Sequence, residues 1–289
     1  MDLTRLFCDI DDFVKALNDS QEHILITQRK SKRGISPRMS LSELMTIIVA
    51  YHSSGFRHFK AYYKFIQVYR SKDFPSLLSY SRFVEWMPYC LIPLCSYLKT
   101  RRGKVTGISY IDSCPIAVCK NIRIPRNKVF KSIGKRGKSS MGWFFGFKLH
   151  IIVNEVGELL SFKVTRGNIH DRVPVKELCN GLSGKLFGDK GYISKKLFEE
   201  LYEDGVQLIT NIRSNMKNKL LPLVDKILLR KRFIIETIND QLKNISNIEH
   251  SRHRSPINFM VNIVAGLISY TWQPKKPAIK WERNALSAL

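Results

Sequence analysis

The sequence is poor in acidic residues and lacks both a metal-spaced set of cysteines and a long apolar run. Its 24 Asp and Glu residues face 48 Lys and Arg residues, which gives a formal charge of +24 at pH 7. This excess favours a polyanionic partner, because cations that neutralise phosphates release condensed counterions. The six cysteines form no CxxC pair and have no histidines at zinc-binding spacing. A zinc site is therefore excluded, and the thiols are expected to be core residues in a reducing compartment.

The longest apolar stretch, 257–272, is interrupted by Asn258, Asn262 and Ser269. It is also shorter than the ~20 residues that span a bilayer. The first residues lack the basic start and apolar run of a signal peptide. We therefore expect no membrane partner and a cytoplasmic location.

The first hundred residues follow helical patterns. Ser40 and Glu43 form the start signal of a capping box, and Pro88 and Pro93 interrupt a helix expected at 82–98. We predict a helical domain that binds DNA or mediates dimerisation. A helical cap on the main domain is the alternative.

From residue 105 onward the periodicity changes to alternation, which indicates strands. Five strands are expected, at 108–114 (closed or bulged by Pro115), 145–153, 159–165, 185–188 and 206–211. Helices are expected at 173–182, 194–204 and from Arg232 onward. The order β-β-β-α-β-α-β-α is that of an α/β protein with a ribonuclease-H-like mixed sheet. The predicted domains are 1–100 (helical), 101–273 (α/β) and 274–289 (a C-terminal tail).

Three carboxylates lie at strand ends or on the late helix. Asp112 ends the first strand, Asp189 follows a short apolar strand, and Glu236 lies on the late helix. Carboxylate oxygens are the ligands that Mg²⁺ or Mn²⁺ prefers, and two such ions ~3.5–4 Å apart serve phosphoryl transfer. Asp171, after the third strand, is a competing candidate for a supporting role or a helix N-cap.

The late helix has an unusual arrangement of charge. At about 100° per residue, Arg232, Glu236 and Lys243 fall within an arc of roughly 40°. An adjacent arc of roughly 100° holds the apolar residues Ile234, Ile235, Ile238, Leu242 and Ile245. One carboxylate flanked by two cations is expected of a site that handles metal and phosphate.

The segment 120–138 contains no acidic residue. Its cations repel one another unless a polyanion lies against them, so we expect them to contact DNA phosphates. The residues predicted to do so are Arg123, Arg126, Lys128, Lys131, Lys135, Arg136 and Lys138. A solvated, disordered loop is the alternative.

These residues resemble a known family, the DDE-class bacterial insertion-sequence transposases. The run Asp-Lys-Gly-Tyr at 189–192 looks like the D-x-G-Y motif of that family, and 232–243 is similar to its Y-x2-R-x3-E-x6-K signature. Asp112-Ser113 and 167–171 also resemble family segments, and the pattern is most similar to insertion-sequence family 982. One position departs from the signature, because Leu229 stands where it has tyrosine.

The resemblance implies Asp112, Asp189 and Glu236 as catalytic metal ligands for two Mg²⁺ or Mn²⁺ ions, with Arg232 and Lys243 on DNA phosphates. Water would attack at the transposon end to free a 3′-OH, which then attacks target DNA. The implied partners are double-stranded DNA, both terminal inverted repeats and target, and further copies of the chain in a homodimer or larger assembly.

Three alternatives remain at this point. A non-catalytic DNA-binding protein derived from a transposase would have no need of the three carboxylates, and a ribonuclease-H-like nuclease that only cleaves would use the same ones. A tyrosine recombinase is suggested by His250, Arg254 and Tyr270, but the usual H-x-x-R spacing is absent.

Overall fold

The computed structural model describes residues 1–19, 38–212, 216, 220–249 and 253–279. The chain forms two compact units. The helical unit comprises Met1–Arg101 and Leu242–Gln273, and the sheet unit comprises Arg102–Gln241 and the residues from Pro274 onward. Within the described ranges, no helix is long and apolar enough to cross a membrane.

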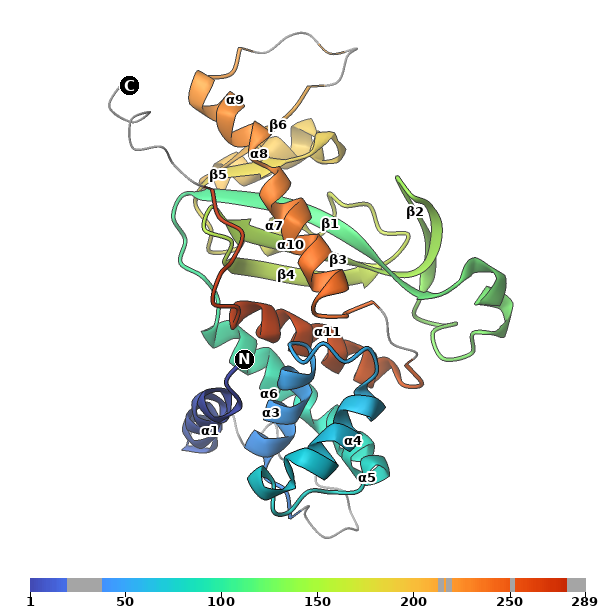
Figure 1. Ribbon diagram of the computed structural model, residues 1–289. Coiled ribbons are helices and arrows are strands. Elements are labelled where there is room, and N and C mark those ends of the chain that lie inside the picture. The colour runs from blue at the N-terminus through green and yellow to red at the C-terminus, as the bar shows by residue number, and fades with distance from the viewer. Residues whose placement is uncertain (20–37, 213–215, 217–219, 250–252, 280–289) are drawn as a thin grey trace. The chain divides into compact units, whose positions relative to one another are not determined.

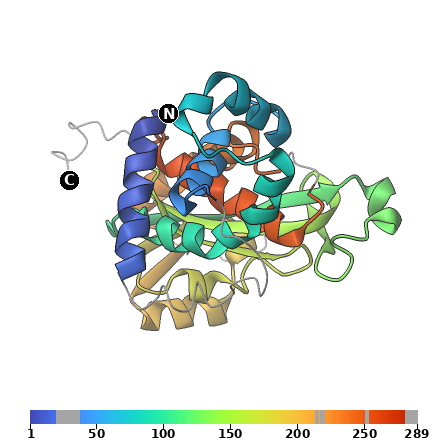
Figure 2. The ribbon, with the colours of Figure 1, turned by 90° about the horizontal axis from the view of Figure 1, so that it is seen from below.

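The helical unit is built from α1 (Leu3–Asp19), α3 (Leu41–Tyr51), α4 (Phe59–Tyr69), α5 (Tyr80–Trp86), α6 (Leu91–Thr100) and α11 (Pro256–Thr271), with the short 3₁₀ turns η1 (Ser71–Asp73) and η2 (Met87–Cys90). Figure 2 shows α1 in dark blue as one continuous helix. The predicted capping box of α3 is confirmed, since Glu43 N–H donates to Ser40 Oγ at 3.1 Å and Ser40 N–H donates to Glu43 Oε2 at 2.6 Å. Of the two predicted interruptions, the one at Pro88 is found, because Pro88 lies in η2 between α5 and α6. The one at Pro93 is wrong, because Pro93 lies in the first turn of α6, where a proline removes no intrahelical hydrogen bond.

The last helix, α11, is the most deeply buried element of the helical unit. Every residue from Val261 to Thr271 is buried, and α11 packs against α3 and α6. A helix that is apolar on all sides is expected in a core rather than on a surface. The 257–272 stretch is therefore a core helix of this unit.

The sheet unit contains one six-stranded mixed sheet (Figure 1). Its strands are β1 (Ile108–Cys119), β2 (Lys135–Ser139), β3 (Gly142–Asn154), β4 (Leu159–Arg166), β5 (Gly184–Gly188) and β6 (Val206–Thr210). β3 is antiparallel to β1 on one edge, and its other edge is shared by β2, opposite 142–146, and β4, opposite 147–153. β5 adds to β1 in parallel, and β6 adds to β5 in parallel.

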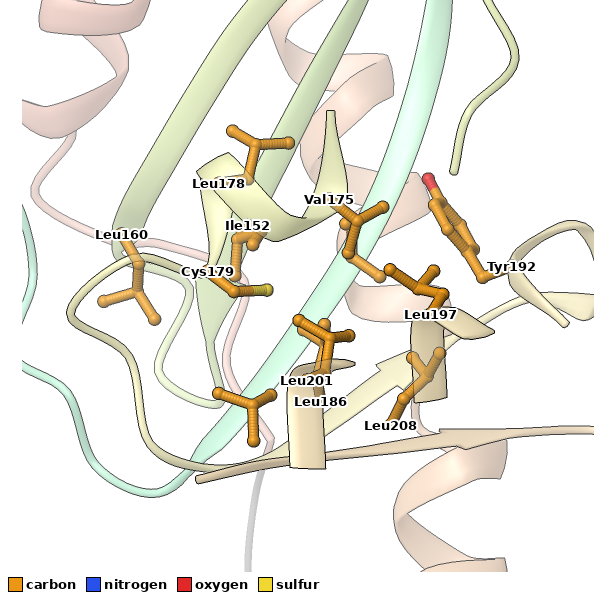
Figure 3. Close-up of a cluster of buried hydrophobic side chains, with 12 residues drawn as sticks. Ile152, Leu160, Val175, Leu178, Cys179, Leu186, Tyr192, Leu197, Leu201 and Leu208 are labelled. Atoms are coloured by element: carbon orange, nitrogen blue, oxygen red, sulfur yellow. The ribbon is translucent and has the colours of Figure 1, made fainter. Parts of the chain in front are cut away.

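The helices of this unit are α7 (Val175–Leu178), α8 (Lys195–Glu203), α9 (Leu223–Arg230) and α10 (Phe233–Asn244), with the 3₁₀ turns η3 (Asn121–Arg126) and η4 (Lys190–Tyr192). Side chains from α7 and α8 interlock with those of the strands in one buried cluster (Figure 3). Its members include Ile111, Ile152, Leu186, Leu201 and Leu208. This cluster holds the strands in position, and the residues at the ends of the strands are therefore held in position as well.

The mixed α/β architecture is confirmed, but several elements differ from their predictions. The segment 120–138 is not simply a loop, because β2 completes the edge of β3 that β4 leaves unpaired. The helix predicted at 173–182 is only the single turn α7, with Leu182 packed against the core from the segment that follows. Ile245 lies beyond the end of α10 and is 52% exposed, whereas Ile234, Ile235, Ile238 and Leu242 are buried as predicted.

Candidate active site

Asp112 and Asp189 face the same gap between two parallel strands. The last paired residues of β1 and β5 are Tyr110 and Phe187. Continuing this register by two residues brings Asp112 opposite Asp189, at the point where the two strands separate. The side chain of Asp189 caps η4, since Gly191 N–H donates to Asp189 Oδ1 at 2.8 Å. The two aspartates therefore converge because of strand register alone.

Asp112 does not end its strand, contrary to the sequence-based expectation. β1 continues through Pro115 to Cys119, with Pro115 opposite Lys148 of β3 and an irregularity only between Ala117 and Cys119. Beyond Tyr110, β1 has no partner on the β5 side. Proline is tolerated there because one edge of the strand is free of ladder hydrogen bonds. Asp112 therefore sits in the middle of a long strand, which holds it rigidly.

Helix α10 brings two further residues to the aspartates. Glu236 lies in its first turn and forms an ion pair with Arg232, the residue before the helix. Asn239, one turn further on, donates from Nδ2 to Asp112 Oδ2 at 2.9 Å. The Oδ1 atom of Asn239 is buried and has no hydrogen-bond partner among the described residues. Sequence reasoning missed Asn239, although a polar residue three positions after Glu236 and beside the apolar stripe was the available signal.

Asp112, Asp189 and Glu236 line one pocket of about 400 Å³ in the sheet unit. Lys138, Arg232 and Asp171 also line it. Burial raises the pKa of Asp112 to about 6, the nearby Arg232 opposes this rise, and the charges of Asp189 and Glu236 add to it. The pocket thus brings three carboxylates close enough to repel one another.

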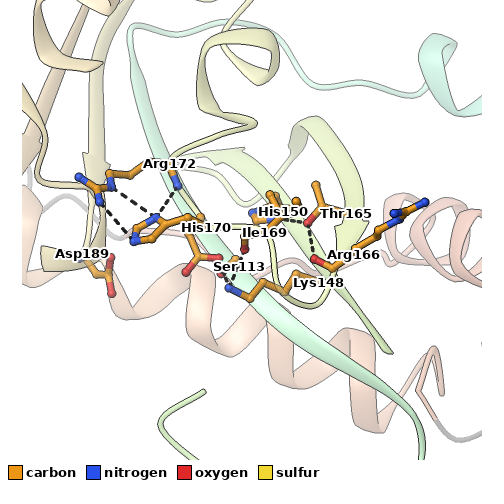
Figure 4. A network of polar contacts seen from close by, with 11 residues as sticks. Ser113, Lys148, His150, Thr165, Arg166, Ile169, His170, Arg172 and Asp189 are labelled. Atoms are coloured by element: carbon orange, nitrogen blue, oxygen red, sulfur yellow. Dashed lines mark hydrogen bonds and ion pairs between the residues drawn. The ribbon is translucent and has the colours of Figure 1, made fainter. Parts of the chain in front are cut away.

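Asp171 is held by hydrogen bonds from Ser113 and Lys148, two residues of the polar network that Figure 4 labels. Lys148 Nζ donates to Asp171 Oδ1 at 2.9 Å, and Ser113 Oγ donates to the same oxygen at 2.8 Å. Burial alone would raise the pKa of Asp171, but these two hydrogen bonds outweigh it and lower the pKa. Since Ser113 follows Asp112 directly, Asp171 helps to fix that part of β1.

A comparison with models of protein families identifies the family of the chain. The model of the transposase DDE domain matches residues 102–256, which is more than half of the chain. The chain is a DDE transposase. The match runs through all three carboxylates of the pocket, and it also includes β2 and α10.

Two other comparisons add little to the identification of this transposase. A chain from a structure titled "CryoEM structure of simian T-cell lymphotropic virus intasome in complex with PP2A regulatory subunit B56 gamma" is 14% identical and matches over 68% of the transposase and 67% of its own length, with a TM-score of 0.27. At that score the likeness carries no structural argument. No curated protein matches the sequence.

The donor set of the pocket suits the divalent cations that DDE transposases generally use. Carboxylate oxygens that repel one another are stabilised by a hard cation, and Mg²⁺ completes its shell with water and substrate oxygens. Among the residues that the structure describes, no three Asp, Glu, His or Cys side chains are grouped closely enough to hold a metal ion. The ion pair between Glu236 and Arg232 competes with metal binding by Glu236.

Lys243 is separate from the pocket of the transposase. It lies in the last turn of α10 and forms an ion pair of 3.0 Å with Glu249. The pair is only partly exposed, at 23% for each side chain. Of the row of charges predicted on this helix, Arg232 and Glu236 therefore line the pocket, and Lys243, which belongs to the helical unit, does not.

The cations predicted in 120–138 are all exposed. Arg123 and Arg126 lie in η3, Lys128 and Lys131 follow it, and the remainder, Lys135, Arg136 and Lys138, lie on β2. Within the described part of the chain, none of these seven forms an ion pair with a carboxylate. Because Lys138 also lines the pocket, the cationic strand reaches the carboxylates.

The residues that suggested a tyrosine recombinase do not form a site. Tyr270 is 1% exposed in the core helix α11, where DNA has no access to its hydroxyl. Arg254 is exposed, and His250 lies outside the described residues.

Proposed function

We propose that this transposase is encoded by an insertion sequence similar to family 982, and that it cleaves DNA at terminal inverted repeats and joins the freed 3′-OH to target DNA. The observation that carries the proposal is the convergence of Asp112, Asp189 and Glu236 on one pocket that a basic strand also reaches. The order β4-β3-β1-β5-β6 supports a ribonuclease-H-like fold for the sheet unit.

The three carboxylates, Asn239 and Arg232 each have a defined role in this proposal. Asp112, Asp189 and Glu236 would hold two divalent ions, and Asn239 orients the Asp112 carboxylate by its hydrogen bond. When bound, such ions activate the attacking oxygen and stabilise the leaving oxygen of phosphoryl transfer. Arg232 releases Glu236 and binds a DNA phosphate, for which its planar guanidinium is suited as a bidentate donor.

The basic strand β2 offers a surface on which double-stranded DNA can bind. Lys135, Arg136 and Lys138 are exposed and unpaired in the described structure, so a phosphate backbone can replace their water without breaking an ion pair. Lys138 then positions the strand at the rim of the pocket. Because two transposon ends are joined in one reaction, the proposal includes a homodimer or a larger assembly of the chain.

The function is tested with the full-length protein, Mg²⁺, and linear DNA that carries the sequences flanking the gene on both sides. We expect nicks at the 3′ ends of the element and joined products with target DNA. Specific binding without cleavage in either Mg²⁺ or Mn²⁺ would instead support the non-catalytic DNA-binding protein. Cleavage without joining would support a nuclease, and a phosphotyrosyl–DNA adduct would overturn the metal-dependent mechanism.

Replacing Lys243 by alanine is expected to weaken binding of the transposon end. Neutralising one phosphate contributes about 0.9 to the slope of log K against log salt concentration, so the slope should fall by about that amount. Equilibrium binding measured from low to moderate salt checks this. Lys226→Ala, an exposed cation on α9, is the matched control. An unchanged slope in Lys243→Ala would show that Lys243 serves only its ion pair with Glu249.

A further inference from the structure

The helical unit has a cavity of its own, of about 560 Å³. It is enclosed by residues of α3, α4 and α5 and by the segment 253–262, which includes the start of α11. Its volume lies within the range of about 300–1,000 Å³ that is typical of small-molecule sites. The catalytic carboxylates do not line it, so the proposed reaction leaves the cavity without a role.

The charge of this cavity is entirely positive. Arg57, Lys60 and Arg254 line it, and no carboxylate is among its described lining residues. Burial lowers the pKa of both His52 and His253 to about 4, so these two rings are neutral at pH 7. The three cations, all exposed, therefore offer a binding place for an anion at the cavity rim.

The walls of the cavity are aromatic. Tyr51 and Phe59 meet edge to face with ring centroids 5.3 Å apart, and Phe59 and Tyr80 are 6.4 Å apart. The ammonium of Lys60 lies 5.7 Å from the centre of the Tyr80 ring. Aromatic faces beside cations are the arrangement on which unpaired bases stack in single-stranded nucleic acid sites.

Two asparagines of α11, Asn258 and Asn262, also line the cavity, so its wall carries neutral polar groups besides the three cations.

We infer that this cavity binds one unpaired nucleotide of a DNA strand, with the phosphate at Arg57 and Arg254 and the base between the aromatic walls. The inference deepens the proposed function, because a transposase acts on strand ends where a nucleotide can leave the duplex. It assigns a role to Arg254, which has no part in the carboxylate pocket.

The test uses the full-length protein in EDTA and a single-stranded tetranucleotide with 2-aminopurine at an inner position. Stacking on the aromatic walls should quench its fluorescence saturably. Arg254→Ala should raise the Kd about tenfold or more, as expected for a lost charge-assisted hydrogen bond. Tyr80→Ala should raise it about 5- to 150-fold, the range for one lost stacking partner. Lys64→Ala removes an exposed cation of α4 outside the cavity and should change the Kd less than twofold.

Equal Kd values for the Arg254 and Lys64 variants would overturn the inference, since attraction would then be diffuse. Displacement of the strand by equimolar free deoxynucleotide or inorganic phosphate would also overturn it, because the site would then take a free anion. Asp189→Asn should quench as the unmodified protein does. Failure of the cavity can therefore be distinguished from failure of the proposed transposase reaction.

Discussion

Asp112→Asn is expected to lower metal-dependent DNA cleavage by about 10³-fold or more, equivalent to a rise of about 4 kcal/mol in the activation barrier. Asparagine keeps the size of the side chain and one oxygen, but it removes the charge that holds a cation. Asp189→Asn and Glu236→Gln should have effects of the same order, while binding to the transposon end is retained. Single-turnover cleavage with a labelled end substrate, measured alongside binding, separates the two properties.

Asp112→Asn should not destabilise the metal-free protein at neutral pH. The pKa of Asp112 is raised from 3.8 to about 6 in the folded state, so the folded protein binds this proton more tightly than the unfolded chain. The stabilisation by the proton is complete below pH 3.8 and is lost as the pH rises through about 6. At pH 7 the asparagine variant avoids the cost of a buried charge, so its melting temperature in EDTA should equal or exceed that of the unmodified protein.

Glu203→Gln is the matched control for the three carboxylate substitutions. Glu203 is exposed at the end of α8 and does not line the pocket, so cleavage should be unchanged. Full cleavage by Asp189→Asn would contradict the assignment of Asp189. Asp171 would then become the leading candidate, although its carboxylate is engaged by Lys148 and Ser113.

Gly146→Ala is expected to destabilise the sheet unit by roughly 3 kcal/mol or more. Gly146 has φ +154° in the middle of β3, and a Cβ there would stand 2.2 Å from the carbonyl oxygen of Ile116 and 3.1 Å from Val118 N. Both are backbone atoms of β1, so neither can move aside without separating the two strands. Thermal and urea unfolding of the full chain, followed by circular dichroism, measure the loss.

Gly205→Ala provides the control for the backbone conformation alone. Gly205 has φ +79°, but nothing lies within 4 Å of a Cβ placed there. Its replacement should cost only about 1–2 kcal/mol. If Gly146→Ala were no more destabilising than Gly205→Ala, β1 and β3 would not be as closely paired as the structure shows.

Sequence patterns predicted the elements whose signal is local. The alternating side chains of β3 and β4 and the capping box of α3 are present near the expected positions. The convergence of Asp112 and Asp189 depends on the register between β1 and β5, which no single segment specifies, although both residues were selected as strand-end carboxylates.

The predictions that were wrong involve elements decided by tertiary contacts. β2 is rich in charge and has little strand propensity, and it forms because β3 offers an unpaired edge. Pro115 was expected to close or bulge β1, but the open edge of the strand accommodates it. Asn239 escaped selection because a single polar residue on a helix gives no sign of the partner 127 positions away.

That long separation has a consequence for synthesis of the protein. The basic strand β2 leaves the ribosome well before α10. Asn239, the hydrogen-bond partner of Asp112, is synthesised 127 residues after it. At about 5–20 residues per second, this interval lasts roughly 6–25 s. During it, the nascent chain already carries its exposed cations but not a complete set of carboxylates. Under the proposed function, the chain thus gains the ability to hold DNA before it gains the ability to cut it.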